Sequence, residues 1–401
     1  MTENVKVLNE ICISKGEYGG GFSAIEKKDS APRYVRITDI TENGGLNQDI
    51  KGPSGTPEDW EKYMLSEGDI LFARSGATVG KTFLYQGLHG KCIYAGYLIR
   101  FRPNPQISFS KYIYYYTKTS WYKLWVENKQ NAVAQPNINA KQYGSELKIP
   151  LPPLPIQKRI AAILDAADAY RQKTKALLEK YDQLAQSLFL EMFGDPVTNP
   201  KGWEVVKLGS VGTIDRGKSK HRPRNAPELL GGPYPLIQTG DVANSSGYIT
   251  EYKTTYSELG LAQSKIWPKG TLCITIAANI AKTGILTFDA CFPDSVVGFT
   301  ASESTTNEYT QFWMSFLQQI LEEKAPESAQ KNINLAILRS LDFPLPPIRL
   351  QEEFVKRIKT LETQKQEAQT ALQKAEDLFN SLLQRAFNGE LAPEAREEEV
   401  T

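Results

Sequence analysis

Two long segments of the chain repeat apolar or small residues at alternating steps of four and three. This pattern keeps one stripe of a helix apolar over many turns, and it is typical of helices that pack along a heptad seam. Prolines precede each segment and a glycine follows each, as expected where helices begin and end. The predicted seam positions are Ile156, Ile160, Ile163, Ala167, Tyr170, Thr174, Leu177, Tyr181, Leu184 and Leu188 in the first segment, and Leu350, Phe354, Ile358, Leu361, Ala368, Leu372, Ala375, Leu382 and Ala386 in the second, where Gln364 and Lys365 interrupt it.

Elsewhere the apolar residues come in short β-prone runs. RYVRITDI (Arg33–Ile40) and CIYAGYLIRFRP (Cys92–Pro103) are examples, and glycine, proline and asparagine separate such runs. Two aromatic-rich runs, Lys111–Asn128 and Glu308–Lys324, each predict a helix packed on a sheet. We expect their rings in the core, and stacking on nucleic-acid bases is the alternative. The fold class is therefore α+β, with mixed α/β globules.

The second half of the chain repeats the first. PLPPLPIQ begins at Pro150 and PLPPIRLQ begins 194 residues later at Pro344, each just before a helical segment. QPNIN and QKNIN precede them, and SLFLEMFGD and SLLQRAFNGE close the two segments. We predict globules at 1–150 and 200–343, helical segments at 151–199 and 344–390, and a disordered acidic tail at 391–401. If the two seams face each other, the helices form an antiparallel coiled coil and an approximate two-fold axis relates the globules.

Composition narrows the possible chemistry. The 401 residues are 41% hydrophobic and 23% charged, with a net charge of +1. Residues 1–150 carry 19 Lys and Arg against 15 Asp and Glu, whereas residues 200–343 carry 14 of each. Any nucleic-acid binding must therefore depend on local patches. Four separated cysteines and two histidines disfavour zinc sites and histidine-based catalysis. The polar start and the lack of a long apolar run predict a cytoplasmic protein without a membrane partner.

The stretch GATVGKT, which ends at Thr82, raises the possibility of a phosphate-binding loop. It is one residue shorter than G-x-x-x-x-G-K-[ST], and β-prone TFLYQGLHG follows it where a helix would be required. The corresponding stretch in the second half is AANIAKT, which keeps only the Lys-Thr. We therefore interpret GATVGKT as a strand–turn–strand element. A nucleotide hydrolase that uses this loop is an alternative function.

Chemistry suggests DNA-contacting residues in both globules. The densest basic stretch, IDRGKSKHRPRN, lies early in the second globule, and SKGEYGGGF occupies the matching place in the first. Arginine and asparagine are common readers of guanine and adenine, whereas lysine usually binds phosphate. For each loop the alternative is a solvated loop without a ligand, and Asn137, Asn139, Asn332 and Asn334 are better explained as caps of a turn. The candidates are Lys15, Tyr18, Arg74, Ser75, Thr78, Lys81, Arg216, Lys218, Lys220, His221, Arg222, Arg224, Asn279 and Lys282.

Two related but divergent globules held at a fixed spacing suit the reading of two unlike half-sites on DNA. The chain resembles the specificity (S) subunits of type I restriction-modification systems over nearly its whole length. The resemblance depends on GDILFARSGATVGKT, QPNIN and the twice-occurring PLPP openings to long helices. It implies that each globule is a target-recognition domain for one part of a bipartite, asymmetric DNA site. It also implies that the helices act as a conserved spacer.

The same resemblance implies partners and excludes catalysis by this chain. Two methylation subunits would dock on the helices and use S-adenosylmethionine, and restriction subunits would add ATP- and Mg-dependent translocation and cleavage. This chain itself would bind no cofactor. The expected partner contacts lie off the seam, on the helix surfaces, and are Gln157, Lys158, Arg159 and Gln351. A third interpretation is a coiled-coil scaffold without affinity for DNA.

Overall fold

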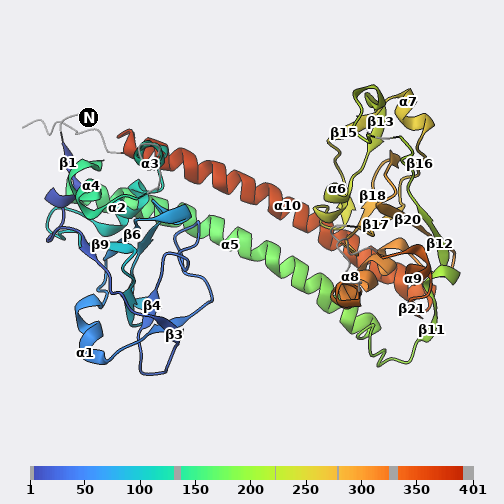
Figure 1. Cartoon of the computed structure of the whole chain (residues 1–401), viewed down its shortest axis with the longest axis horizontal. Coiled ribbons are helices and arrows are strands. Elements are labelled where there is room, and N and C mark those ends of the chain that lie inside the picture. Colours follow the sequence, from blue (N-terminus) through green and yellow to red (C-terminus); the bar gives the residue numbers. More distant parts are fainter. Residues whose placement is uncertain (1–3, 131–136, 222, 278–279, 325–332, 392–401) are drawn as a thin grey trace, which may run out of the picture. The chain divides into compact units, whose positions relative to one another are not determined.

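The computed structural model describes residues 4–130, 137–221, 223–277, 280–324 and 333–391. The chain forms two compact units. Unit 1 comprises Met1–Lys175 and Thr370–Thr401, and unit 2 comprises Ala176–Gln369 (Figure 1). Each unit is mixed helix and sheet, and the two long helices are shared between the units. The predicted acidic tail lies outside the described residues, apart from Leu391.

The predicted long helices are confirmed as α5 (Leu154–Phe193) and α10 (Ile348–Phe387). Prolines occupy only the first turn or the residues before it, where a missing N–H costs no hydrogen bond. Gly194 and Gly389 follow the helix ends with φ of 79° and 85°, a left-handed conformation that a residue with a Cβ adopts at a cost.

In each unit, parts of the two long helices pack against each other in opposite directions. In unit 2, Phe189 of α5 contacts Phe354 of α10, and Asp182 pairs with Lys365. The residue number rises on α10 as it falls on α5, so the two helices are antiparallel. In unit 1, the guanidinium of Arg171 lies 4.5 Å from the ring of Phe379. The antiparallel arrangement that the connectivity predicted is therefore present within each unit.

The buried seam of α5 differs in part from the predicted one. Ile160, Ala167 and Thr174 are buried as expected, but Tyr170, Leu177 and Leu184 are 53%, 41% and 50% exposed. The residues that follow these three, Arg171, Leu178 and Ala185, are each more buried. In the same way Leu164 is more buried than Ile163 before it. The seam positions in the set of Ile160, Ala167 and Thr174 were thus correct. Those in the set of Tyr170, Leu177 and Leu184 were wrong by one residue, since steps of 4,3 and 3,4 fit a helix equally well.

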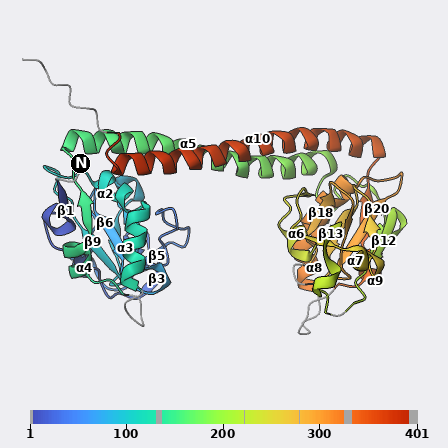
Figure 2. The same ribbon diagram turned by 90° about the horizontal axis from the view of Figure 1, so that it is seen from above.

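Unit 1 is built on a sheet of order β2-β9-β6-β7 with all neighbours antiparallel. The helices α2 and α3 cover it (Figure 2) and bury Tyr112, Ile113, Tyr122 and Val126 in the core. The strands are β1 (Val5–Val7), β2 (Glu17–Tyr18), β3 (Ala24–Glu26), β4 (Arg33–Val35), β5 (Lys51–Pro53), β6 (Ile70–Ala73), β7 (Thr82–Leu84), β8 (Cys92–Tyr94), β9 (Leu98–Phe101) and β10 (Lys148–Pro150). The short helices are α1 (Pro57–Trp60), α2 (Ser110–Tyr116), α3 (Ser120–Gln130) and α4 (Ala140–Glu146).

Unit 2 repeats this plan with a sheet of order β12-β20-β17-β18-β14. Its second sheet, β15-β13-β19-β16, is larger than its counterpart in unit 1, where β4 pairs parallel with β8 as β13 does with β19. The strands are β11 (Glu204–Lys207), β12 (Gly212–Arg216), β13 (Leu230–Leu236), β14 (Tyr248–Ile249), β15 (Thr254–Tyr256), β16 (Ile266–Trp267), β17 (Leu272–Thr275), β18 (Thr283–Leu286), β19 (Ala290–Cys291), β20 (Val296–Ala301) and β21 (Asp342–Leu345). The short helices are α6 (Thr239–Ala243), α7 (Glu258–Ala262), α8 (Asn307–Lys324) and α9 (Leu335–Arg339).

The repeat extends to single contacts. In each unit the first strand pairs antiparallel with the strand before the long helix, β1 with β10 and β11 with β21. Asn139 caps α4 by accepting a hydrogen bond from the backbone N–H of Gln142, and Asn334 caps α9 in the same way. The structural role that we favoured for these two asparagines is confirmed, although each caps a short helix rather than the proline turn itself. Asn332 lies outside the described residues.

The aromatic run of unit 1 forms two helices where one was predicted. α2 ends and α3 begins around Thr117 and Thr119, whose hydroxyls each donate 2.7 Å hydrogen bonds to carbonyls three residues earlier. Such bonds compete with the backbone pattern of a continuous helix. The predicted core role of the aromatic rings is confirmed, because Tyr112 and Tyr122 are 1% and 2% exposed.

Candidate nucleic-acid interface

The stretch that resembles a phosphate loop is a turn between antiparallel strands. Ile70 of β6 pairs with Leu84 of β7, and a single 3-10 turn, Gly76–Thr78, lies between the strands. A Cβ added to Gly80 would lie 2.7 Å from a Val126 methyl group, so this glycine allows α3 to pack closely. The element that follows the turn is the strand β7, and not the helix that a phosphate loop requires. The strand–turn–strand interpretation is confirmed and a nucleotide cradle is not supported.

The structure brings together two of the predicted DNA contacts in unit 1. Arg74 follows β6, and its guanidinium lies over the ring of Tyr18 at 4.8 Å from the centroid. Arg74 Nε also donates to Asn137 Oδ1 at 3.3 Å, and Tyr18 Oη accepts from the N–H of Ala140. Arginine that is stacked on an aromatic ring keeps free donors in a fixed orientation. The ends of β2 and β6 therefore present a preoriented arginine side chain.

One exposed aromatic residue near this pair was missed from the sequence. The N–H of Arg74 donates to the carbonyl of Tyr97 at 3.0 Å, and Tyr97 is 62% exposed. The sequence places Tyr97 inside a β-prone run, which suggests a core position. The exception could have been found only from the preceding Gly96, which interrupts that run. We add Tyr97 to the candidate surface of unit 1.

The other predicted residues of this loop are more constrained. Lys81 forms an ion pair with Glu42, and Thr78 Oγ1 donates to the carbonyl of Ser75 at 3.2 Å. Ser75 is partly buried, and Lys15 is exposed just before β2. Lys15 therefore lies on the surface, whereas the charge of Lys81 is already balanced within unit 1.

The glycines around Gly19 serve packing. A Cβ on Gly19 would lie 2.3 Å from the carbonyl oxygen of Ala95. Gly19 therefore allows a close approach within unit 1.

In unit 2, three predicted cations form a line. Arg216, Lys218 and Lys220 are exposed, and they alternate with buried Gly217 and Ser219. Alternation of this kind is typical of extended backbone, in which every second side chain points the same way at intervals of about 6.6 Å. The three positive charges thus lie on one face, a suitable arrangement for a phosphate backbone.

Neighbouring residues hold this basic line in place. Gln263 Oε1 accepts from the N–H groups of Lys220 and His221, and Ser264 Oγ donates to the carbonyl of Lys218. Arg224 pairs with Asp294, so it is less available than predicted. Arg222 lies outside the described residues.

The lysine that corresponds to Lys81 does not project freely either. Lys282 Nζ donates to Gln318 Oε1 at 3.2 Å and lines a cavity of unit 2. The neighbouring candidate Asn279 lies outside the described residues. DNA contact by these residues stays a prediction.

The repeat shows which surface positions have diverged. Gly19 donates to the carbonyl of Leu98, and Gly217 donates in the same way to Val296, so Arg216 occupies the position of Tyr18. By the same kind of match, Ile276 occupies the position of Arg74, and it is 3% exposed. The frame is shared, whereas the exposed side chains at the same edge differ.

Two predicted partner contacts are corrected by the structure. Gln157 and Gln351 are both 0% exposed. Gln157 Oε1 accepts from the N–H of Phe109 at 2.8 Å, while its Nε2 donates to two carbonyls, and Gln351 has an equivalent set of bonds. These amides join the start of each long helix to the preceding loop, so they cannot be surface contacts. Lys158 and Arg159 are exposed, as expected.

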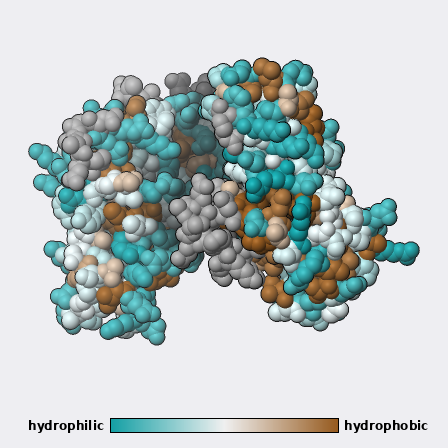
Figure 3. All heavy atoms as spheres, turned by 45° about the vertical axis from the view of Figure 1, so that its right-hand side comes forward, coloured by the Kyte–Doolittle hydropathy of each residue, from teal (hydrophilic) through white to brown (hydrophobic). Residues whose placement is uncertain are grey.

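The remaining surface has limited chemistry of other kinds. Across the described residues, no group of three or more His, Cys, Asp and Glu is placed to hold a metal ion. Likewise, none of the helices described here is both long and apolar enough to cross a bilayer. On the face seen in Figure 3, hydrophilic residues predominate and apolar residues gather in separate patches.

The comparisons agree with the duplicated fold. The chain belongs to the family of the type I restriction modification DNA specificity domain, whose model matches residues 4–180 and again residues 200–376. It is 25% identical over 370 residues to the type I restriction enzyme EcoKI specificity subunit of Escherichia coli K12, covering 84% of this chain and 78% of that one. It is 24% identical over 370 residues to the StySPI specificity subunit of Salmonella potsdam, with the same coverage.

A solved structure shows the same fold. The S subunit of a type I restriction-modification system from M. genitalium matches with a TM-score of 0.59 at 14% identity, covering 96% of both chains. By family, the chain is thus a specificity subunit with DNA recognition domains. It is a non-catalytic component that assembles with other restriction-modification subunits. Neither the nucleotide hydrolase nor the scaffold without DNA affinity is supported.

Proposed function

We propose that unit 1 and unit 2 each read one half of a bipartite, asymmetric DNA sequence. The proposal rests on one observation: the two units share the same backbone framework, but they carry different side chains at equivalent positions at one end of the sheet. Unit 1 presents Arg74 on Tyr18, an arrangement suited to guanine, which offers two acceptors in the major groove. Unit 2 presents Arg216 and buried Ile276 at those positions. Two readers that differ in this way would recognise two different half-sites.

We further propose that the long helices fix the half-site spacing and dock two methylation subunits. Tyr170, Leu177 and Leu184 recur every seven residues on α5 and are exposed, although each is large and apolar. Side chains at heptad spacing lie on one stripe of a helix, which favours packing against another protein surface. The exposed charges of Lys158 and Arg159 lie on the same helix.

The chemistry of the complex would come from its partners. Methylation subunits would supply S-adenosylmethionine for adenine methylation, and restriction subunits would use ATP and Mg. Within this division of labour, the chain contributes only sequence recognition and assembly. We expect it to act in the cytoplasm, where its DNA substrate would be accessible.

A methylome comparison tests the proposal. Adenine methylation would be mapped genome-wide in cells with the gene, without it, and with the gene restored. We expect one gapped, two-part motif to lose methylation on deletion and to regain it on restoration. A deletion that changes no motif while the methylation subunits are expressed would contradict the proposal.

A further inference from the structure

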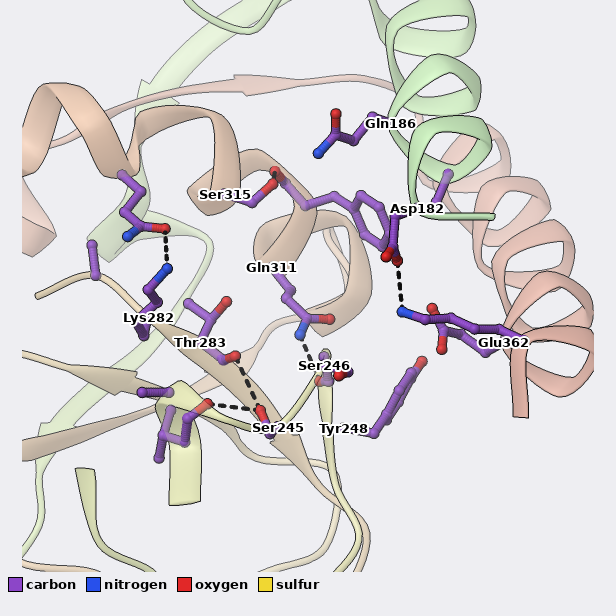
Figure 4. A pocket seen from close by; sticks show the side chains of 18 residues that line it. Asp182, Gln186, Ser245, Ser246, Tyr248, Lys282, Thr283, Gln311, Ser315 and Glu362 are labelled. Carbon is purple, nitrogen blue, oxygen red and sulfur yellow. Dashed lines mark hydrogen bonds and ion pairs between the residues drawn. The ribbon is translucent and has the colours of Figure 1, made fainter. Parts of the chain in front are cut away.

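Unit 2 contains a cavity of about 410 Å³ that has no assigned role (Figure 4). Its walls come from α5, α8, α10 and the strands β14 and β18. Asp182 and Lys365 form a 2.6 Å ion pair at one side, where Glu362 and Tyr248 also lie. Lys282 lies on the opposite side in Figure 4, with its ammonium bonded to Gln318. Charged side chains of both signs and other polar groups therefore line the cavity together with apolar ones.

At the matching place in unit 1 lie a lysine ammonium and a tyrosine ring. Lys118 Nζ donates to Thr82 Oγ1 at 3.3 Å and lies 4.4 Å from the ring centroid of Tyr114. Tyr114 Oη in turn donates to the carbonyl of Asn43. Desolvation lowers the pKa of Lys118 to about 8, and Asp168 is the nearest carboxylate that favours its charged form. Unit 1 therefore holds an ammonium group of its own between α2, β7 and α5.

The repeat shows that this place in unit 1 is equivalent to the cavity of unit 2. Tyr112 and Tyr309 each donate a 2.8 Å hydrogen bond to the carbonyl of the proline that begins PLPP, which aligns α2 with α8. With this alignment Gln311 replaces Tyr114 and Ser315 replaces Lys118. Both replacements are smaller, and the serine carries no charge. The place of the ammonium in unit 1 is thus open in unit 2.

The partners of that ammonium are retained. Thr283 stands for Thr82, and on the helix wall Glu362 and Lys365 stand for Asp168 and Arg171. In unit 1 the aspartate and arginine pair with each other. In unit 2 Lys365 instead pairs with Asp182, which leaves Glu362 without an ion pair among the residues described.

Two groups in the cavity are incompletely satisfied, although the Glu308 carboxylate interacts with the Tyr248 hydroxyl and Lys365 with Glu362. Burial raises the pKa of the Glu362 carboxyl, which indicates that its charge is poorly compensated. The hydroxyl of Tyr248 is buried without a hydrogen bond of ordinary geometry in the described structure. A buried polar group without a partner costs free energy, which a suitable ligand would recover.

We propose that this cavity of unit 2 binds a primary ammonium group, supplied either by a free alkylamine or polyamine or by a lysine side chain of a partner protein. An ammonium has three donors and no acceptor, and it can therefore bond to the Glu362 carboxylate, the Tyr248 oxygen and the Thr283 hydroxyl. An anion would face Asp182 and Glu362. The site concerns unit 2 alone and does not depend on which bases the chain reads.

Binding of n-butylammonium to the full-length chain tests the proposal directly. We expect saturable binding by calorimetry, whereas tetramethylammonium, which has no N–H donor, should not bind at equal concentration. Glu362→Gln should weaken binding about tenfold, since it removes a charge-assisted hydrogen bond. Glu353→Gln, an exposed carboxylate on the same helix, should leave binding unchanged.

Refilling the cavity provides a second test. Ser315→Lys should restore the arrangement of unit 1, abolish butylammonium binding and raise the Tm by about 2 °C. Ser315→Leu should block binding without that gain. Conversely, Lys118→Ser should lower the Tm and create a second site at which butylammonium restores it. The proposal is overturned if butylammonium does not bind, or if it binds equally well to Glu362→Gln and Ser315→Lys.

The source of the ammonium can then be determined. If it is a free polyamine, spermidine should bind at least as tightly as butylammonium, and Ser315→Lys should assemble normally with methylation subunits. If it is a partner lysine, spermidine should bind no better than butylammonium, and Ser315→Lys should reduce co-elution with those subunits by about tenfold. Either result is consistent with an ammonium site in unit 2. If calorimetry shows no binding of butylammonium, both sources are excluded.

Discussion

Arg74 is both restrained and available for contact. The ring of Tyr18 and the Asn137 side chain restrain its guanidinium, and the hydrogen bond to Asn137 uses Nε. The two terminal nitrogens can therefore form the paired hydrogen bonds that recognise guanine. Because the orientation is set before binding, less side-chain entropy is lost on contact.

Arg74→Ala should therefore impair one half-site selectively. In a complex with methylation subunits, we expect methylation of the natural site to fall about tenfold to 100-fold and discrimination to relax at one base pair. Arg74→Lys should give a methylation rate between those of Arg74→Ala and the unchanged protein, since lysine cannot present a planar fork of donors. Lys141→Ala, an exposed cation on α4, is the matched control. An unchanged motif and rate in Arg74→Ala would exclude this role.

The basic line of unit 2 leads to a different prediction. Lys218 and Lys220 face the same side as Arg216 and are held by backbone bonds to Gln263 and Ser264. If they bind phosphates, Lys218→Ala and Lys220→Ala should weaken binding to all sequences alike. Each should also reduce the slope of log K against log salt by about 1. Fluorescence anisotropy over a salt series measures this slope. Lys253→Ala, exposed elsewhere in unit 2, should not change it, and an unchanged slope in the first two variants would contradict phosphate contact.

Sequence reasoning identified residue types at the interface better than it identified their surroundings. Tyr18 and Arg74 were selected for their chemistry, but nothing in the sequence indicates that they stack, since 55 intervening residues set their approach. Lys81 was selected as a free cation, and its pairing with Glu42 depends on how a distant loop folds back. Gln157 was placed on the surface because it lies off the predicted seam. Its burial becomes evident only when α2 is placed beside it.

At the scale of elements, the buried glutamines act as connectors between each long helix and its globule. Gln157 satisfies the N–H of Phe109 and the carbonyls of Ile107 and Pro152. Gln157→Leu would leave these backbone groups buried without partners, which we expect to cost about 3 kcal/mol of unit 1 stability. Hydrogen exchange should show lower protection of α2, while Lys158→Ala should change stability by less than about 0.5 kcal/mol. Unchanged protection of α2 in Gln157→Leu would contradict the connecting role.

Gln351 offers the same test in unit 2. It bonds to Thr305, Thr306 and Pro346 at the start of α8 and α10. The recurrence of one buried amide at the same point of both repeats explains why PLPPLPIQ and PLPPIRLQ each end in glutamine. The sequence shows that the glutamine recurs in both repeats, whereas only the structure shows that it bonds to the buried backbone.

The seam shows the limit of periodicity as evidence. Alternating steps correctly predicted two long helices and their antiparallel packing within each unit. They did not distinguish the buried set from the set one residue away, because α5 carries apolar side chains in both, as Leu177, Leu178, Leu184 and Ala185 show. Tyr170, Leu177 and Leu184 are apolar and exposed, so burial in this chain alone does not explain them. A surface that another subunit covers would account for a helix with more apolar positions than one seam requires.

At the scale of the whole molecule, duplication is the property that the sequence reveals most directly. Motifs at a nearly constant offset predicted two copies of one globule, and the family model matches the chain twice. The divergence between the copies was less predictable, because it lies in single positions such as Ile276, and in the larger second sheet of unit 2, which has no sequence motif. A fixed frame with variable edges lets recognition change while folding and assembly are preserved.

This separation of frame from edge gives the last prediction. Replacing residues 200–343 with the corresponding segment of another family member should change one half of the methylated motif and leave the other half and the gap unaltered. The reason is that β11 to β20, the first half of β21 and their loops lie in the replaced segment, whereas α5, α10 and the sheet of unit 1 remain. The measurement is adenine methylome sequencing of cells that carry the exchanged gene, with Arg74→Ala introduced as a second change. If the exchange alters one half and Arg74→Ala then affects only the other, the two units read independently. A motif that changes in both halves after the exchange would show that the units do not act separately, and the assignment of one half-site to each would have to be abandoned.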